Sequence, residues 1–308
     1  MAEISIVIPC YNCETSLAKC LDSVRAQTFE DWEALVVNDG SSDGSAEILR
    51  CLASRDSRIK ILTQGNEGQA IARNRALAQA SGAYVCFLDA DDFCDAAFLA
   101  DLHSEAKRSD ADIVMTTTRR IKANEIVQTH FDRVVLTRFS DKIKALPHGG
   151  VWDKIYKADL IRKHQITFPA HLYYEDNLFL VKALFHADRF AVINGAGYNY
   201  VTNPNSTLHN PTLEDKRTKD GIAIFEMIMD FASERSCPEE DRRALSDFCV
   251  KNFLDVKKMA EEDFRRVKDL LCPTPFLEKR LKRRARRIFK RKILRSFGLR
   301  GILRFLGE

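Results

Sequence analysis

Three carboxylates stand close together in the first third of the chain. Asp89, Ala90, Asp91 and Asp92 come directly after the apolar residues 84–88, which form a short strand-like run. Open α/β sheets bind ligands where their strands end. Carboxylates this close repel one another, and a divalent cation shared with phosphate oxygens removes that repulsion. The cluster therefore predicts a Mg²⁺ or Mn²⁺ site that serves a diphosphate group.

The acids also have a purely structural interpretation. Asp92 or Asp95 would serve as the N-cap of a helix expected over residues 96–109, because a side-chain oxygen there satisfies a free N–H of the first turn. The metal interpretation is favoured because the cluster does not stand alone.

Two more polar segments follow predicted strands. Residues 38–44 contain Asp39 and two glycines, and residues 9–12 follow the first strand. Asp39 could accept from the imide N–H of uracil or from a ribose hydroxyl, and glycine allows a close approach of backbone. An ordinary turn is the alternative. Since no GxGxxG follows a strand, something other than a glycine loop must hold the phosphates, and a metal on Asp89 or Asp91 is the candidate.

The order of apolar runs and amphipathic stretches indicates a βαβ sheet. Each early strand is followed by a helix long enough to return, which favours parallel pairing with right-handed crossovers. Strands are predicted over residues 4–8, 33–38, 59–63, 83–88 and 112–117. Helices are predicted over residues 15–27, 45–55, 69–81 and 96–109. Beyond them we expect a hairpin over residues 125–135, a strand around residues 189–200 and helices over residues 213–271.

Arg73 lies one turn into the predicted helix that opens at residue 69. Its guanidinium could steady a phosphate or a neighbouring carboxylate such as Asp91, at any relevant pH. The alternative is a surface arginine.

Glu175 and Asp176 begin an apolar helix that runs to Phe185. Acids in a first turn interact favourably with the helix dipole, and that alone explains many such pairs. The functional interpretation is that one of them is a general base that faces the metal site.

Composition narrows the class of protein. With 308 residues, 45% of them apolar, the chain can bury a sizeable core. It shows neither a signal segment nor an apolar run of bilayer length, so we expect a cytoplasmic location. The nine cysteines are scattered, which is typical of reduced thiols. Cys10 and Cys13 form a lone CxxC, and without a second pair or a nearby histidine neither a zinc site nor a redox pair is favoured.

Taken together, six motifs resemble in order and spacing those of family 2 glycosyltransferases with the GT-A fold. The resemblance covers about residues 4–205 and implies a Rossmann-like mixed sheet flanked by helices, with an α/β fold class and a C-terminal helical extension. The motifs lie at residues 7–12, 37–43, 72–74, 88–92, 152–156 and 175–176.

By this resemblance, Pro9, Tyr11 and Asp39 cradle the nucleoside, with Asp39 on the base. Asp89 lies near the ribose and diphosphate, and Asp91 holds a Mn²⁺ or Mg²⁺ ion. The full predicted donor set is Pro9, Tyr11, Asn12, Asp39, Ser41, Arg73, Asp89, Ala90 and Asp91.

The resemblance also implies a reaction. Asp176, with Glu175 beside it, matches the family's catalytic base, and the sugar would pass from a nucleotide, most plausibly UDP, with inversion at the anomeric carbon. Trp152 and Lys154 are predicted to contact the acceptor, with a core position as the alternative for the tryptophan. His209 resembles a further metal or phosphate contact, with an ordinary loop histidine as the alternative.

The processive members' Gln-x-x-Arg-Trp signature and membrane helices are missing. A single sugar added to a glycan or lipid-linked acceptor, in bacterial surface-polysaccharide assembly, is therefore expected. A sugar nucleotidyltransferase is an alternative, but it needs a glycine- and arginine-rich loop after the first strand. The second alternative is a protein without turnover that binds a nucleotide sugar or serves as a membrane scaffold.

The expected organisation is a catalytic domain over residues 1–212, divided at residue 118 into nucleotide-sugar-binding and acceptor-binding parts, then helices over residues 213–275. Residues 276–308 form a basic tail, since thirteen Lys or Arg and two Glu lie in residues 277–308. Its apolar residues recur at near-helical spacing, which favours peripheral binding to the anionic inner face of the cell membrane. Docking on the catalytic domain or on a second subunit of a homodimer is the alternative. No recognition motif supports nucleic acid.

Overall fold

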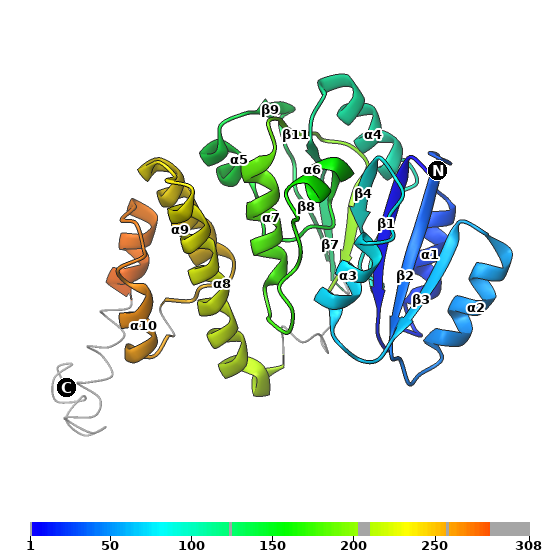
Figure 1. The fold of residues 1–308 in the computed structure, drawn as a ribbon, viewed down its shortest axis with the longest axis horizontal. Helices are drawn as coiled ribbons and strands as arrows, with labels where there is room; N and C mark the ends of the chain where they lie inside the picture. Colours follow the sequence, from blue (N-terminus) through cyan, green and yellow to red (C-terminus); the bar gives the residue numbers. More distant parts are fainter. Residues whose placement is uncertain (1, 123–124, 203–209, 257–258, 284–308) are drawn as a thin grey trace. The chain divides into compact units, whose positions relative to one another are not determined.

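The computed structural model describes residues 2–122, 125–202, 210–256 and 259–283 (Figure 1). It divides into two compact units, Met1–Leu213 and Glu214–Glu308. Among the described residues, no helix combines the length and the apolar character needed to cross a bilayer.

The first unit is built on an eight-stranded mixed sheet with the order β3-β2-β1-β4-β10-β6-β11-β9. Its strands are β1 (Ile4–Cys10), β2 (Trp32–Asp39), β3 (Ile59–Gln64), β4 (Tyr84–Phe87), β6 (Ile113–Met115), β9 (Val134–Leu136), β10 (Lys154–Lys157) and β11 (Phe190–Val192). A second sheet has the order β5-β12-β7-β8. It contains β5 (Phe93–Cys94), β7 (Thr118–Lys122), β8 (Glu125–Gln128) and β12 (Tyr198–Val201).

Helices cover both faces of the large sheet. Alternate residues of β1, from Ile4 to Cys10, share a core with the apolar faces of α1, α2 and α4, while α3 packs on β1 and β2 (Figure 1). The helices of this unit are α1 (Leu17–Arg25), α2 (Ser45–Arg55), α3 (Gln69–Leu77), α4 (Phe98–Ser109), α5 (Phe139–Ala145), α6 (Ala158–Lys163) and α7 (Glu175–His186). A 3-10 turn, η1, spans Pro211–Leu213.

Parallel pairing is confirmed for β1 with β2, β2 with β3 and β1 with β4. It is wrong between β4 and β6, because the antiparallel strand β10 lies between them, whereas β6 pairs in parallel with β11. The predicted hairpin is displaced, since the antiparallel pair is β7 with β8. The single strand expected around residues 189–200 is two strands, β11 and β12, in different sheets.

The second unit is helical in its described part. It contains α8 (Glu214–Glu234), α9 (Glu239–Asn252) and α10 (Glu261–Val267), and residues 275–283 are helical as well. Residues 284–308, which make up most of the predicted basic tail, lie outside the described residues.

Candidate active site

The loops after β1 and β2 are tied to each other by polar contacts. The Asn12 N–H donates to Ser41 Oγ at 3.1 Å, and the Ser42 N–H donates to Asn12 Oδ1 at 2.8 Å. Asn12 has a φ of 48°, a left-handed conformation that asparagine tolerates. Tyr11 is 48% exposed, while Pro9 is half-buried at the end of β1. Because β1, β2 and β4 are neighbours, the predicted convergence of their polar ends is confirmed.

Asp39, the last residue of β2, is buried and organises the loop that leads into α3. Its Oδ1 accepts from Gln64 Nε2 at 2.9 Å and from the Glu67 N–H at 2.8 Å, and its Oδ2 accepts from the Gly68 N–H at 2.8 Å. Gly40 has a φ of 71°, and a Cβ there would lie 2.8 Å from the Asn66 nitrogen. The role of Asp39 on the nucleobase stays a prediction.

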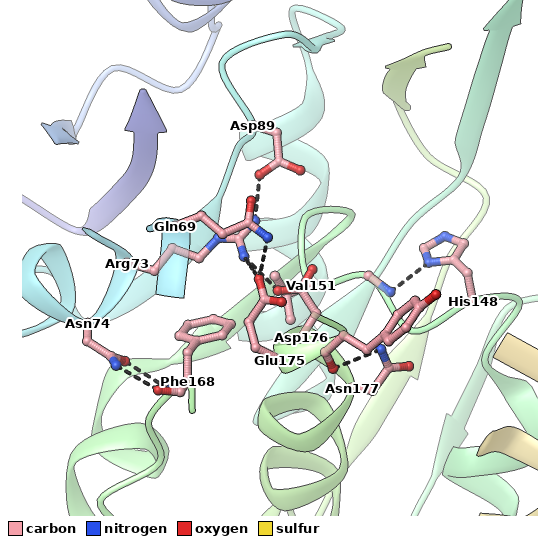
Figure 2. A network of polar contacts seen from close by, with 12 residues as sticks. Gln69, Arg73, Asn74, Asp89, His148, Val151, Phe168, Glu175, Asp176 and Asn177 are labelled. Atoms are coloured by element: carbon pink, nitrogen blue, oxygen red, sulfur yellow. Dashed lines mark hydrogen bonds and ion pairs between the residues drawn. The ribbon is translucent and has the colours of Figure 1, made fainter. Parts of the chain in front are cut away.

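Arg73 connects the donor side of the site to the start of α7 (Figure 2). Its side chain is 1% exposed, and its NH2 donates to Asp89 Oδ1 at 2.7 Å. Its NH1 donates to Glu175 Oε1 at 2.9 Å and to Asp176 Oδ1 at 2.7 Å. Gln69, one turn earlier on α3, also donates to Glu175. The surface alternative for Arg73 is wrong, and its carboxylate partner on the β4 loop is Asp89 rather than Asp91.

Three carboxylates therefore share one guanidinium. Desolvation raises the pKa of Asp176 well above its ordinary value, with the charges of Glu175 and Asp89 adding to it and that of Arg73 opposing it. The side chain of Asp176 is 18% exposed, whereas that of Glu175 is 3% exposed. Asp176 is thus the member of the pair that a substrate can reach, and it binds a proton more readily than an ordinary carboxylate does.

Two backbone features place α7. Tyr174, immediately before it, has a φ of 67°, and the Asn177 N–H donates back to the Tyr174 carbonyl at 3.0 Å. Asn74 on α3 holds the preceding segment, since it donates to the Phe168 carbonyl at 2.8 Å and accepts from the Phe168 N–H at 2.9 Å (Figure 2). Helix α3 thus supplies both the positive charge that pairs with the acids on α7 and the contacts that hold the segment before them.

Asp92 and Asp95 are not N-caps, so that alternative is wrong. The Tyr198 hydroxyl donates to Asp92 Oδ2 at 2.7 Å and accepts from the Asp89 N–H at 3.2 Å, while the Val201 N–H donates to Asp92 Oδ1 at 2.7 Å. Asp95 accepts from Arg119 and from other groups near β12. Helix α4 begins only at Phe98. These two acids anchor β12 beneath the β4 loop.

The predicted acceptor residues lie inside the first unit. Trp152 is 9% exposed and stacks with Tyr198 at 4.3 Å and His148 at 4.5 Å between ring centroids. Lys154 is fully buried, where its Nζ donates to Asp153 Oδ1 at 2.5 Å and to the Gly150 carbonyl at 2.8 Å. Neither residue presents an open face or a free ammonium in this structure, and a contact of either with the acceptor stays a prediction. His209 lies outside the described residues.

Comparison with known proteins identifies the family. Residues 5–167 match the description Glycosyl transferase family 2. The chain belongs to this family. A protein of Bacillus subtilis (strain 168) named as a glycosyltransferase, EpsH, is 30% identical over 80% of this chain and 74% of its own length. EpsJ of the same organism is 29% identical over 77% of this chain and 73% of its own length.

Solved structures of glycosyltransferases share the fold. That of S. aureus TarS 1-349 with UDP-GlcNAc has a TM-score of 0.70 at 24% identity, over 89% of this chain and 82% of TarS 1-349. The mannosyltransferase PcManGT of Pyrobaculum calidifontis, solved with GDP-Man and Mn²⁺, has a TM-score of 0.56 at 15% identity, over 92% of this chain and 84% of that one. The predicted GT-A fold is confirmed, and the protein is a family 2 glycosyltransferase.

The carboxylates of Asp89 and Asp91 are oxygen ligands of the kind that a hard divalent cation takes, although they are only two. Partial desolvation and the charge of Asp89 raise the pKa of Asp91 to about 6, which indicates negative charge without full compensation. Asp89 has one oxygen on Arg73. Among the described residues, no group of three or more His, Cys, Asp or Glu side chains could hold an ion. An ion bound to Asp89 and Asp91 would therefore need phosphate or water oxygens as further ligands.

Two supporting residues of the site were missed at the sequence level. Gln69 precedes Arg73 by four positions on one helix, a spacing that puts both side chains on the same face and so could have indicated a shared partner. Tyr198, which joins Asp92 to the Asp89 backbone, lies more than 100 residues away in sequence from both. No local pattern predicts that contact.

Proposed function

We propose that this enzyme transfers a sugar from a nucleotide-sugar donor to a hydroxyl of a glycan or lipid-linked acceptor, with inversion at the anomeric carbon. The observation that carries the proposal is the bridge made by Arg73 between Asp89 on the β4 loop and Asp176 at the start of α7. A displacement reaction needs a leaving-group site and a base on opposite sides of one carbon atom. The bridge supports this proposal, because one side chain joins an acid on the β4 loop to an acid at the start of α7.

The donor is proposed to lie along the loops after β1, β2 and β4. Tyr11 offers an exposed aromatic ring beside Asn12 and Ser41, where a nucleoside would rest. Asp39, Pro9, Ala90 and Arg73 complete the proposed donor set beneath it. UDP is the preferred nucleotide, because TarS, which shares the fold, was solved with UDP-GlcNAc.

A Mn²⁺ or Mg²⁺ ion is proposed on Asp91 and Asp89, where it would neutralise the diphosphate as it leaves. The raised pKa of Asp91 supports this, because a carboxylate that lacks a cationic partner gains most from one.

Asp176 is proposed to take the proton of the acceptor hydroxyl as the new C–O bond forms and the bond from the anomeric carbon to the phosphate oxygen breaks. Its raised pKa favours this role, since a more basic carboxylate accepts a proton more readily. Glu175, buried against Arg73 and Gln69, is proposed to hold the guanidinium in place.

The remaining assignments are also proposals. Residues 1–118 would bind the nucleotide sugar, residues 119–212 would bind the acceptor, and residues 276–308 would hold the enzyme on an anionic membrane surface from the cytoplasmic side. The EpsH and EpsJ relatives are named as glycosyltransferases of a bacterium, which supports the transfer reaction itself; the proposed place in assembling a bacterial surface polysaccharide rests on the resemblance to the family.

A donor screen tests the function. UDP-, GDP- and dTDP-sugars are compared for the rise in melting temperature and for slow hydrolysis, with and without Mn²⁺, because a ligand that binds only the native state stabilises it. Asp176→Asn should retain the shift and lose turnover. The matched control is Asp188→Asn, an exposed carboxylate just beyond α7, which should behave as wild type. Binding without turnover in the wild-type enzyme, with every acceptor class, would favour the scaffold alternative instead.

A further inference from the structure

Two cysteines at the end of β1 face each other at very short range. Cys10 is the last residue of the strand and is 1% exposed, and Cys13 is half-buried in the loop that follows. Their Sγ atoms are 3.0 Å apart. At the sequence level a redox pair was not favoured, because neither a second cysteine pair nor a nearby histidine accompanies the lone CxxC. In the structure the two sulfur atoms nevertheless lie in contact with each other.

The surroundings of the pair stabilise a thiolate. The Cys13 thiol lowers the pKa of Cys10, against desolvation by burial, and the hydroxyls of Ser45 and Ser41 add to the effect. The Cys13 N–H donates to Ser45 Oγ at 2.9 Å, so the second cysteine is held at the start of α2. A thiolate with a second thiol in contact is the arrangement from which disulfides form, since the thiolate is the nucleophile.

The pair also encloses part of the proposed donor site. Tyr11 and Asn12 are the two residues between the cysteines, and Asn12 makes the contacts to Ser41 and Ser42 that join the first two loops. A change at the sulfur atoms must therefore be transmitted to the residues proposed to meet the nucleoside.

We propose that Cys10 and Cys13 are a modification site, a dithiol that peroxide converts to an intramolecular disulfide. In the first step a thiolate displaces hydroxide from hydrogen peroxide, which gives a sulfenic acid and, after proton uptake, water. In the second step the other thiol attacks that sulfur, the S–S bond forms, the S–O bond breaks and a second water leaves. Two thiols are oxidised, one peroxide is reduced, and a dithiol reductant reverses the change.

The bond brings the sulfur atoms from 3.0 Å to about 2.05 Å apart. The resulting displacement of the loop is expected to cost the Asn12 contacts, so the KM for the donor should rise about threefold to tenfold, the equivalent of one hydrogen bond. This consequence rests on the proposed function, whereas the disulfide itself does not.

Mass spectrometry tests the chemistry directly. Trypsin releases residues 1–19 as one peptide, in which Cys10 and Cys13 are the two cysteines. The folded full-length protein is treated with hydrogen peroxide and then with iodoacetamide. We expect this peptide to lose two hydrogens and to take up no alkyl group, and to take up two after dithiothreitol. Cys13→Ser should abolish the loss. Cys51→Ser, at an exposed cysteine on α2, should leave it unchanged.

Two results would overturn the proposal. One is a peptide that is still alkylated twice at a peroxide dose that oxidises Cys51, and the other is a peptide that gains only sulfinic or sulfonic oxygens. The second half of the experiment measures the donor KM before oxidation, after it and after reduction, in wild type and Cys13→Ser. A disulfide with an unchanged KM would refute the link to the donor site. The mass shift would still appear in a protein that showed no transferase activity, so the two proposals fail separately.

Discussion

Replacing Arg73 with methionine is the sharpest test of the bridge between the two sides of the site. The guanidinium is buried, and the change removes hydrogen bonds of 2.7, 2.9 and 2.7 Å to three carboxylates while it keeps a side chain of similar length. The carboxylate of Glu175 is destabilised most by this change. Its side chain is 3% exposed, and of the partners described above for it only the Gln69 amide would remain.

The size of the effect follows from burial. Breaking a buried ion pair by removing one partner typically costs about 3–5 kcal/mol, because an uncompensated charge remains. We expect a loss of that size at pH 7.5 and a smaller one at pH 5. The sign follows from linkage: without the cation the native carboxylates bind protons more tightly, so acidification stabilises the variant relative to wild type.

Urea unfolding followed by tryptophan fluorescence measures the effect in the relevant unit, because Trp32 and Trp152, the two tryptophans of the chain, both lie in Met1–Leu213. Arg73→Lys should lie between wild type and Arg73→Met, since an ammonium keeps the charge but not the planar fork. Arg50→Met is the control, because Arg50 and its partner Glu47 have side chains that are 67% and 80% exposed. An exposed pair contributes only about 0–1 kcal/mol. If Arg73→Met were no less stable than this control, the electrostatic account of the site would be wrong.

Three further outcomes are expected. Asp176→Asn should lower kcat by about 10²–10⁴ with little change in donor KM, as removal of a general base does, and a matching fall in donor affinity would instead give Asp176 a binding role. Glu33, whose pKa is lowered to about 2 by Lys60 and neighbouring hydroxyls despite its burial, should contribute stability that is present above pH 4.5 and lost as the pH falls toward 2. Urea unfolding of Glu33→Gln at pH 3 and pH 5 should therefore show a smaller acid loss than wild type does. Asp91→Asn should remove the Mn²⁺-dependent part of the donor-induced melting shift, yet raise the melting temperature of the free protein at pH 7.5, because the raised pKa of Asp91 means that its charged form destabilises the fold there. A calorimetric scan checks both signs, and a lower melting temperature would contradict the second.

The part of the fold that sequence predicted well is the part in which neighbours in sequence are neighbours in space. β1, β2 and β3 are apolar runs separated by amphipathic helices, and α2 matches its predicted bounds, residues 45–55. β10 was not predicted from the sequence, because it is four residues long and begins and ends with lysine. Its apolar pattern is too short to indicate a strand. Its antiparallel insertion depends on contacts about 70 residues away in sequence, with β4.

The site divides in the same way. Asp89, Asp91 and the acids on α7 could be singled out from the sequence. They are acidic residues, as a metal site or a general base requires, and they lie at the end of a predicted strand or at the start of a predicted helix. Their mutual arrangement could not be predicted, since Arg73 is 102 and 103 residues from Glu175 and Asp176. The burial of side chains could not be predicted from the sequence either. A lysine within a motif can face a substrate or, like Lys154, pair with a buried aspartate.

The excess of negative charge explains why the site can be both stable and reactive. Arg73 neutralises one of the three carboxylates that it touches, and Asp91 adds a further negative charge nearby. A fold selected only for stability would replace one of these acids, because like charges in a partly desolvated region raise the free energy of the native state. Desolvation, with the charges of Glu175 and Asp89 adding to it, raises the pKa of Asp176 and so favours the uptake of a proton there. The excess negative charge also favours any cationic ligand at the β4 loop, so that a metal bound together with its nucleotide would lower the repulsion among these carboxylates. Under the proposed function, the free energy that this repulsion costs the free protein would be recovered when the donor and its metal bind.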